Sequence, residues 1–210
     1  MSNEAESTPS KSDSYQMRCG VTLGILAAIM AANSIGGARW GAAALKGAGE
    51  KGTAYAWYQS KSIKESMIEG NRDNVLALLE TSDAKGAYKE RLQANLDRLN
   101  KTLVRYAKEK QEILVGSQGV GKENWVIKHN GEMGKVKGAQ EWEVAVTLYE
   151  EAGDIFDLSA LFLQLSLVLG SISLLLNRPS VRNSFYGGMV GLGVVGLYFL
   201  VQAFVMVGGL

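Results

Sequence analysis

Apolar residues are concentrated at the two ends of the chain, and charged residues in its middle. Two uncharged runs, Leu158 to Leu176 and Phe185 to Leu210, flank a short basic turn around Pro179. At about 1.5 Å per residue, runs of this length match a hydrocarbon core of about 30 Å. Backbone groups in lipid need internal hydrogen-bond partners, so the runs predict transmembrane helices at 154–177 and 183–210.

A third uncharged run, Gly20 to Ala38, lies near the start of the chain. It is weakly apolar, and a helix-compatible pattern continues past Trp40. We therefore predict an uncleaved transmembrane helix at 17–45 in preference to a cleaved signal peptide. The polar, serine-rich stretch 1–16 predicts a disordered tail.

The charged middle, 46–153, predicts a helical extramembrane stalk. Within 84–115, a seam of mostly apolar residues alternates four and three residues apart, which is a coiled-coil spacing. The seam consists of Leu92, Leu96, Leu99, Leu103, Tyr106, Lys110 and Ile113. Its partner is either the predicted helix 54–68 folding back or a second subunit. The expected fold is all-α, with three transmembrane helices and a helical-hairpin or coiled-coil stalk.

Aromatic residues of the first stalk helix are expected to pack against the segment 142–146. They are Tyr55, Trp57 and Tyr58, and their expected partner segment begins at Trp142. An aromatic cage for a ligand is the less favoured alternative.

Small residues recur every four positions along the first transmembrane helix, at Gly20, Gly24, Ala28, Ala32 and Gly36. Gly187 and Gly191 repeat that spacing in the last one. Such stripes let helix backbones approach closely in lipid, so both predict helix–helix interfaces, within the chain or between copies. The intramembrane polar residues are Asn33, Gln164 and Gln202. Of these, Gln164 and Gln202 are expected to face protein, as is Ser166. In a pore, the path would be lined by Asn33, Ser34, Gln164 or Gln202.

The segment 116–138 carries six glycines and predicts a loop. Gly116 to Lys122 resembles a phosphate-binding loop, but Glu123 follows where a magnesium-binding Ser or Thr is required. A helical seam also precedes the string where that motif needs a strand. We therefore predict no nucleotide site, and we interpret His129 as a surface histidine.

Composition limits the possible chemistry. One cysteine excludes an internal disulfide, one histidine excludes a multi-histidine metal cluster, and the formal net charge is +1. Basic residues of the middle are interleaved with acids, which argues against nucleic-acid binding. No catalytic residue, cofactor site or metal site is predicted.

The order of segments resembles an uncharacterised bacterial membrane-protein family, the domain of unknown function DUF4337. The resemblance rests on Trp57 to Lys64 (WYQSKSIK) and on Phe156 to Gln164 (FDLSALFLQ), and it covers the chain from about Met17 onward. The glycine-rich segment looks like an insertion relative to the charged helix usual there. The resemblance implies architecture and bacterial origin, and no activity.

These observations favour a non-enzymatic integral membrane protein that forms a homo-oligomeric scaffold or interaction assembly. The alternatives are a pore or channel subunit and an accessory subunit of another membrane complex. Expected partners are the lipid bilayer, further copies of the chain and an unknown protein that binds the stalk. The basic turn around Pro179 is expected to be cytoplasmic, which places the amino terminus in the cytoplasm and the stalk in the periplasm of the bacterial inner membrane.

Overall fold

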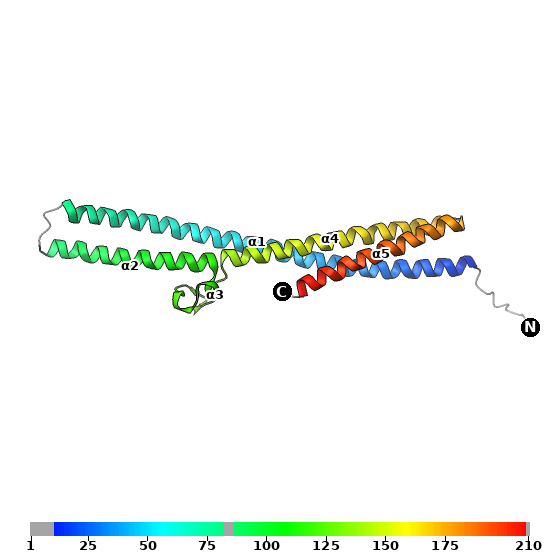
Figure 1. Ribbon diagram of the computed structural model, residues 1–210, viewed down its shortest axis with the longest axis horizontal. Coiled ribbons are helices and arrows are strands. Elements are labelled where there is room, and N and C mark those ends of the chain that lie inside the picture. Colours follow the sequence, from blue (N-terminus) through cyan, green and yellow to red (C-terminus); the bar gives the residue numbers. More distant parts are fainter. Residues whose placement is uncertain (1–10, 82–85, 209–210) are drawn as a thin grey trace, which may run out of the picture. The chain divides into compact units, whose positions relative to one another are not determined.

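The computed structural model describes residues 11–81 and 86–208, and within these ranges the chain is almost entirely helical (Figure 1). This confirms the all-α class. The elements are α1 (Lys11–Thr81), α2 (Ala87–Val115), α3 (Ser117–Val120), the 3-10 helix η1 (Lys122–Asn124), β1 (Lys128–His129), β2 (Glu132–Met133), α4 (Ala139–Leu175) and α5 (Pro179–Gly208). The two short strands pair antiparallel, with Lys128 opposite Met133.

The chain divides into two compact units. We call residues up to Ala44, together with those from Leu148 onward, the three-helix unit; Leu45 to Thr147 form the hairpin unit. Helices α1 and α4 each contribute residues to both units.

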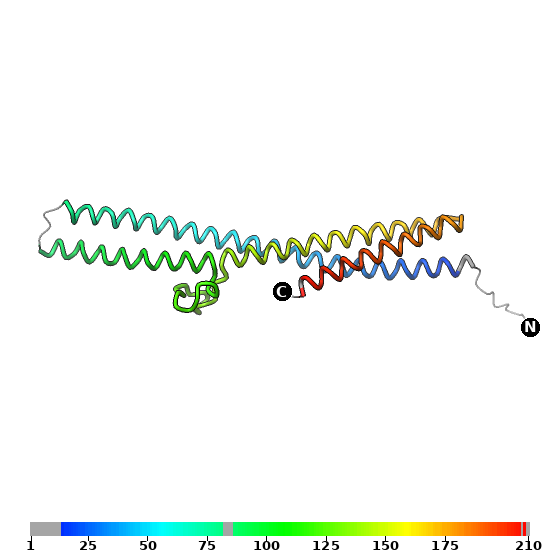
Figure 2. Tube along the Cα trace, in the orientation of Figure 1, coloured from blue at the N-terminus to red at the C-terminus, as the bar shows by residue number. Residues whose placement is uncertain are grey.

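In the three-helix unit, the first part of α1 packs with α4 and α5 (Figure 2). The buried positions of α4 alternate four and three residues apart, a spacing that keeps one helix face against its neighbours. These positions are Ala152, Phe156, Ser159, Leu163, Ser166, Gly170 and Ser173. One core cluster forms around Phe156, Leu200 and Ala203, and another around Cys19, Leu26, Leu163 and Met189.

Helix α1 begins at Lys11, so residues 11–16 are helical and the predicted disordered tail is wrong for them; residues 1–10 lie outside the described part of the chain. Tyr15 gives the physical reason. Its ring meets Tyr186 edge-on at 5.8 Å between centroids, its hydroxyl is hydrogen-bonded to Ser173, and the Arg182 guanidinium lies 3.8 Å from its centroid. These tertiary contacts extend the helix beyond what local composition predicts.

The later helix boundaries also differ from the predicted segments. Helix α4 runs from Ala139 through the predicted boundary at 153 and 154 without a break. Helix α5 begins at Pro179, whose missing N–H costs nothing at a first helical position. It is described as far as Gly208, so the last two residues of the predicted 183–210 segment lie outside the described residues.

In the hairpin unit, α2 packs antiparallel to the second part of α1 (Figure 1). Leu92, Leu96 and Leu99 are 8 to 9% exposed and form a cluster with Val75 of α1. The first half of the predicted seam is therefore buried. Its partner within the chain is the part of α1 around Ile68, Val75 and Leu79, mostly beyond the predicted helix 54–68. A second subunit as a further partner stays a prediction.

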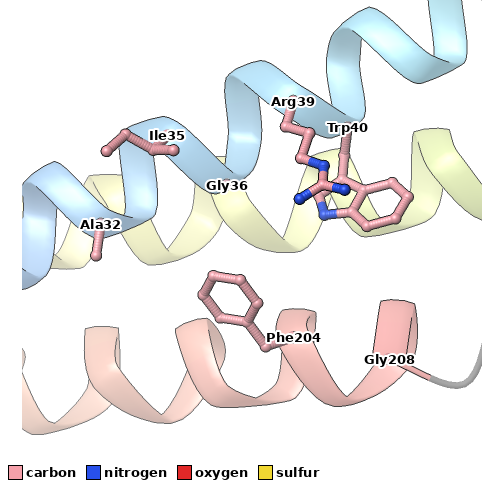
Figure 3. A pocket seen from close by; sticks show the side chains of 7 residues that line it. All are labelled: Ala32, Ile35, Gly36, Arg39, Trp40, Phe204 and Gly208. Atoms are coloured by element: carbon pink, nitrogen blue, oxygen red, sulfur yellow. The ribbon is translucent and has the colours of Figure 1, made fainter.

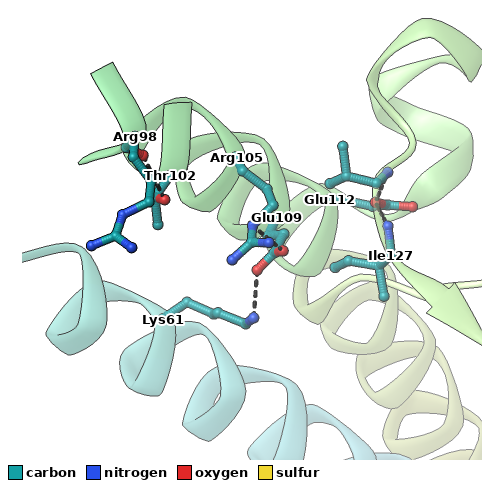
Figure 4. Close-up of polar contacts among 8 residues, drawn as sticks. Lys61, Arg98, Thr102, Arg105, Glu109, Glu112 and Ile127 are labelled. Carbon is teal, nitrogen blue, oxygen red and sulfur yellow. Dashed lines mark hydrogen bonds and ion pairs between the residues drawn. The ribbon is translucent and has the colours of Figure 1, made fainter. Parts of the chain in front are cut away.

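The second half of the seam is more polar. Leu103, Tyr106 and Lys110 are only half-buried, and ion pairs join the two helices there. Lys61 pairs with Glu109 (Figure 4). Lys110 pairs with Glu65. Ile113 is again fully buried, in a cluster with Ile127 and Val136.

The predicted loop 116–138 is tied to α2 by Glu112, which is fully buried. Its carboxylate accepts hydrogen bonds from Ser117 Oγ (2.7 Å) and from the N–H of Val126 (2.9 Å). It also accepts one from the N–H of Ile127 at 3.0 Å (Figure 4). Gly138 packs so closely that a Cβ there would lie 2.2 Å from the nitrogen of Gly116. Residues 116 and 138 therefore close the segment at its base.

Candidate interaction surfaces

A ladder of serine hydroxyls joins α4 to α5. Ser159, Ser166 and Ser173 are spaced seven residues apart and are fully buried. They donate to the carbonyl oxygens of Gly196 (2.8 Å), Met189 (2.5 Å) and Arg182 (3.1 Å), which are also spaced by seven. Hydrogen bonds between helices in lipid contribute about 0.6 kcal/mol each on average. Sequence reasoning selected only Ser166; the seven-residue serine spacing was the signal for the other two.

The four-residue stripe of small residues on α1 is covered at one end only. A Cβ on Gly36 would lie 2.6 Å from Phe156 Cε1, so this glycine permits close packing of α1 and α4. Gly20 and Gly24 have open space around them, and Ala28 and Ala32 are exposed. The physical reason is geometric: at 3.6 residues per turn, a four-residue repeat drifts about 40° per step away from the buried face. Contact of the first four residues with a second copy stays a prediction.

On α5, Gly187 and Gly191 also have open space around them. Close approach within the chain occurs at other glycines. A Cβ on Gly193 would lie 2.7 Å from Leu26 Cδ2, and one on Gly196 would lie 2.8 Å from Leu163 Cγ. Among the described residues, no atom of a neighbouring helix lies within 4 Å of a Cβ at Gly187 or Gly191, and their role between copies stays a prediction.

The intramembrane polar residues fall into two groups. Asn33 is 2% exposed, and its Nδ2 donates to the carbonyl oxygen of Phe156 at 3.1 Å. Its Oδ1 is buried without a hydrogen-bond partner among the described residues. Gln164 and Gln202 are exposed on α4 and α5. Asn33 therefore packs within the chain, whereas contact of Gln164 and Gln202 with protein stays a prediction.

An apolar cavity of about 430 Å³ lies between α1 and α5. Figure 3 shows the Phe204 ring pointing from α5 towards α1, where Ile35, Arg39 and Trp40 lie. Trp40 also packs against Tyr149, with 5.6 Å between ring centroids. Tryptophan and tyrosine side chains are enriched at membrane–water boundaries, so a place for Trp40 at such a boundary is a prediction from its residue type.

The predicted aromatic residues of the hairpin unit take different places. The Tyr55 hydroxyl donates a hydrogen bond to Glu143 Oε2 at 3.3 Å. Tyr55 therefore contacts the segment 142–146, against which it was expected to pack. Desolvation, and then the charge and hydrogen bond of Glu143, raise the pKa of Tyr55. Trp57 and Tyr58 both pack against the Ile113 cluster, and Trp57 also lines a groove together with Trp142.

Two lysines connect the ion pairs to aromatic rings. Lys110 Nζ lies 5.5 Å from the Tyr58 ring centroid, and the hydrogen bond to Glu65 raises the pKa of Lys110. Lys61 Nζ lies 5.3 Å from the Tyr106 centroid. Helices α1 and α2 are therefore held together by charge as well as by leucine packing.

The string that resembles a phosphate-binding loop follows helix α2 and not a strand. Its residues form the short helix α3 and the start of η1. His129 is exposed on β1. Among the described residues, no group of three or more His, Cys, Asp or Glu side chains is placed to hold a metal ion.

Helices α1, α4 and α5 are each long and apolar enough, over at least part of their length, to cross a membrane, which makes three candidate spans within the described residues. The architecture is therefore all-α, with three helices whose length and composition suit a membrane protein. The model of the family described as "Domain of unknown function (DUF4337)" matches residues 15–206, and the chain belongs to this family. The chain matches no curated protein and no solved structure.

Proposed function

We propose that the protein is a non-enzymatic integral membrane protein of the bacterial inner membrane that assembles with copies of itself. In this proposal the hairpin unit is an extramembrane stalk that serves as a scaffold or interaction surface. The main support for self-assembly is that Gln164 and Gln202 are exposed on helices of membrane-spanning length. A glutamine amide has no hydrogen-bond partner in lipid, and such side chains bind across helix contacts. A second copy supplies those partners.

The uncovered part of the small-residue stripe supports the same proposal. Gly20, Gly24, Ala28 and Ala32 leave a smooth, exposed face on α1. In lipid, helix association depends on van der Waals packing and hydrogen bonds, so a face without side-chain bulk favours close contact with another helix. The glutamines and the stripe together give the three-helix unit two features suited to association.

Light scattering of the detergent-solubilised protein tests the proposal against the chain mass of 22.6 kDa. We expect a particle of several chain masses, and a shift towards a single chain in the double variant Gln164→Leu with Gln202→Leu. The control variant Val168→Leu with Val201→Leu changes residues on the same helices that are each 54% exposed, and it should keep the full mass. A wild-type particle of one chain would contradict self-assembly and favour an accessory subunit of another complex.

A pore is the second candidate function. Its support is that Ser34, Gln164 and Gln202 are exposed and available to line a path between copies. Asn33, the other residue expected in such a lining, is instead packed against the Phe156 backbone. Ion flux through reconstituted liposomes that is abolished by Gln164→Leu with Gln202→Leu would favour the pore; an assembled particle without flux would favour the scaffold.

A further inference from the structure

The groove that Trp57 and Trp142 share lies wholly within the hairpin unit and has a volume of about 430 Å³. That volume is in the range of small-molecule sites, about 300 to 1,000 Å³. Lys46, Lys135 and Lys137 line it together with one acidic residue, Glu50. Three lysines against one glutamate give the lining a formal charge of +2, counting histidine as neutral.

The lysines are available to a ligand. Among the described residues, none forms an ion pair with Lys46 or Lys137. Lys135 lies 3.8 Å from Glu132, but both side chains are more than half exposed, and pairs of this kind contribute little. Lys137 Nζ lies 3.9 Å from the Trp142 ring centroid, which fixes its ammonium group at the groove wall.

Buried contacts hold the basic side of the groove in place. The N–H of Val136 donates to Ser117 Oγ at 3.0 Å, and its carbonyl accepts from the Ser117 N–H at 2.9 Å. Ser117 is itself bonded to the buried carboxylate of Glu112. Val136 is buried, whereas Lys135 and Lys137 on either side of it are exposed, and both lysines line the groove.

From this arrangement we propose that the groove binds a phosphate-bearing anion. Lysine ammonium groups bind phosphate as point charges, and the walls formed by Trp57, Trp142 and Ala54 suit the organic part of the ligand. The phosphate belongs either to a soluble phosphate ester or to the headgroup of an anionic phospholipid. Lys46 follows the first apolar segment of α1 closely in sequence, where basic residues attract anionic headgroups.

Isothermal titration calorimetry on the full detergent-solubilised chain tests the proposal with two probes. Glycerol 3-phosphate represents the soluble ester, and phosphatidylglycerol in mixed micelles represents the lipid, with phosphatidylcholine as the reference. The groove variant is Lys46→Gln with Lys135→Gln and Lys137→Gln. The matched control, Lys89→Gln with Lys101→Gln and Lys122→Gln, removes the same charge at exposed positions outside the groove.

We expect saturable binding of at least one probe by the wild type and by the control. The binding affinity should fall by about fivefold for each lysine removed from the groove. Lys46→Gln alone should lower the binding affinity by the amount expected for one lysine. This variant should stay folded, because the Lys46 side chain is exposed and its replacement leaves the core intact. Binding of glycerol 3-phosphate identifies a soluble ester as sufficient; binding of phosphatidylglycerol alone identifies the lipid. Absence of binding to both probes, or equal losses in the groove and control variants, would overturn the proposal.

Discussion

Glu112 shows how one buried side chain organises a glycine-rich segment. A fully buried carboxylate is costly unless its oxygens accept hydrogen bonds. Here one hydroxyl and two backbone N–H groups supply them, and no basic side chain among the described residues pairs with it. The segment after α2 is thereby fixed to the helix that precedes it.

Replacing Glu112 with Gln should destabilise the hairpin unit by about 1 to 3 kcal/mol, because an amide group cannot satisfy all three donors. Hydrogen exchange of the Val126 and Ile127 amides should accelerate accordingly. Glu132→Gln is the control, since the Glu132 side chain is 70% exposed in the same segment. Unchanged protection at both amides in Glu112→Gln would show that the carboxylate does not hold the segment.

At the scale of elements, two periodicities compete on the apolar helices. The four-residue repeat on α1 is conspicuous in the sequence, whereas the buried face follows positions spaced by seven, such as Cys19, Leu26 and Asn33. Among the residues of the stripe, Gly36 alone is buried. Substitutions at Gly36 and at Gly24 can therefore distinguish packing within the chain from packing between copies.

Gly36→Leu should disrupt the three-helix unit, because its side chain would overlap the Phe156 ring. Gly24→Leu should leave that unit folded, since the space around Gly24 is open, but it should lower the mass of the assembled particle. Thermal unfolding in detergent and light scattering measure the two effects. If Gly24→Leu kept the wild-type mass, the stripe would have no part in assembly.

The leucine seam of α2 was predictable from its spacing alone. Charged residues occupy the other faces of this helix, so the leucines form its single apolar face. Leu99→Lys should loosen the hairpin, since it buries an unpaired charge at a position that is 8% exposed. Limited proteolysis should then cut within 84–115. Val104→Lys, on the same helix at a position that is 61% exposed, should give the wild-type cleavage pattern. Identical patterns for all three proteins would place Leu99 outside the packed core.

For the whole molecule, long uncharged runs were enough to predict the apolar helices and the all-α class. Contacts between distant residues were not predictable in the same way. Tyr15 stabilises the start of α1 by contacts with residues more than 150 positions away in the sequence. Glu112 accepts hydrogen bonds from backbone amides of a segment whose sequence predicts only a loop. Trp57 and Trp142 were expected to pack against each other's segments, with an aromatic cage as the less favoured alternative. The basic lining was not predicted, because its lysines come from two separate stretches of sequence.

Orientation is the last property at this scale, and it is a prediction from charge. Arg178 and Arg182 lie in or beside the turn between α4 and α5 without a nearby acid, which favours the cytoplasm, although Arg39, Lys46 and Lys51 oppose that orientation. Three spans then place the hairpin unit in the periplasm. Cys19 is fully buried, so the only native thiol is unsuited to report on either side.

In a Cys19→Ala background, single cysteines at exposed positions provide the test. An impermeant maleimide should label Lys101→Cys in intact spheroplasts, because that residue is exposed on α2 in the hairpin unit. Asn183→Cys, exposed near the start of α5, should be labelled only after the membrane is permeabilised. The reverse labelling pattern would place the hairpin unit in the cytoplasm. In that case the basic residues that follow the first apolar segment would determine the orientation, and not the two arginines at the α4–α5 turn.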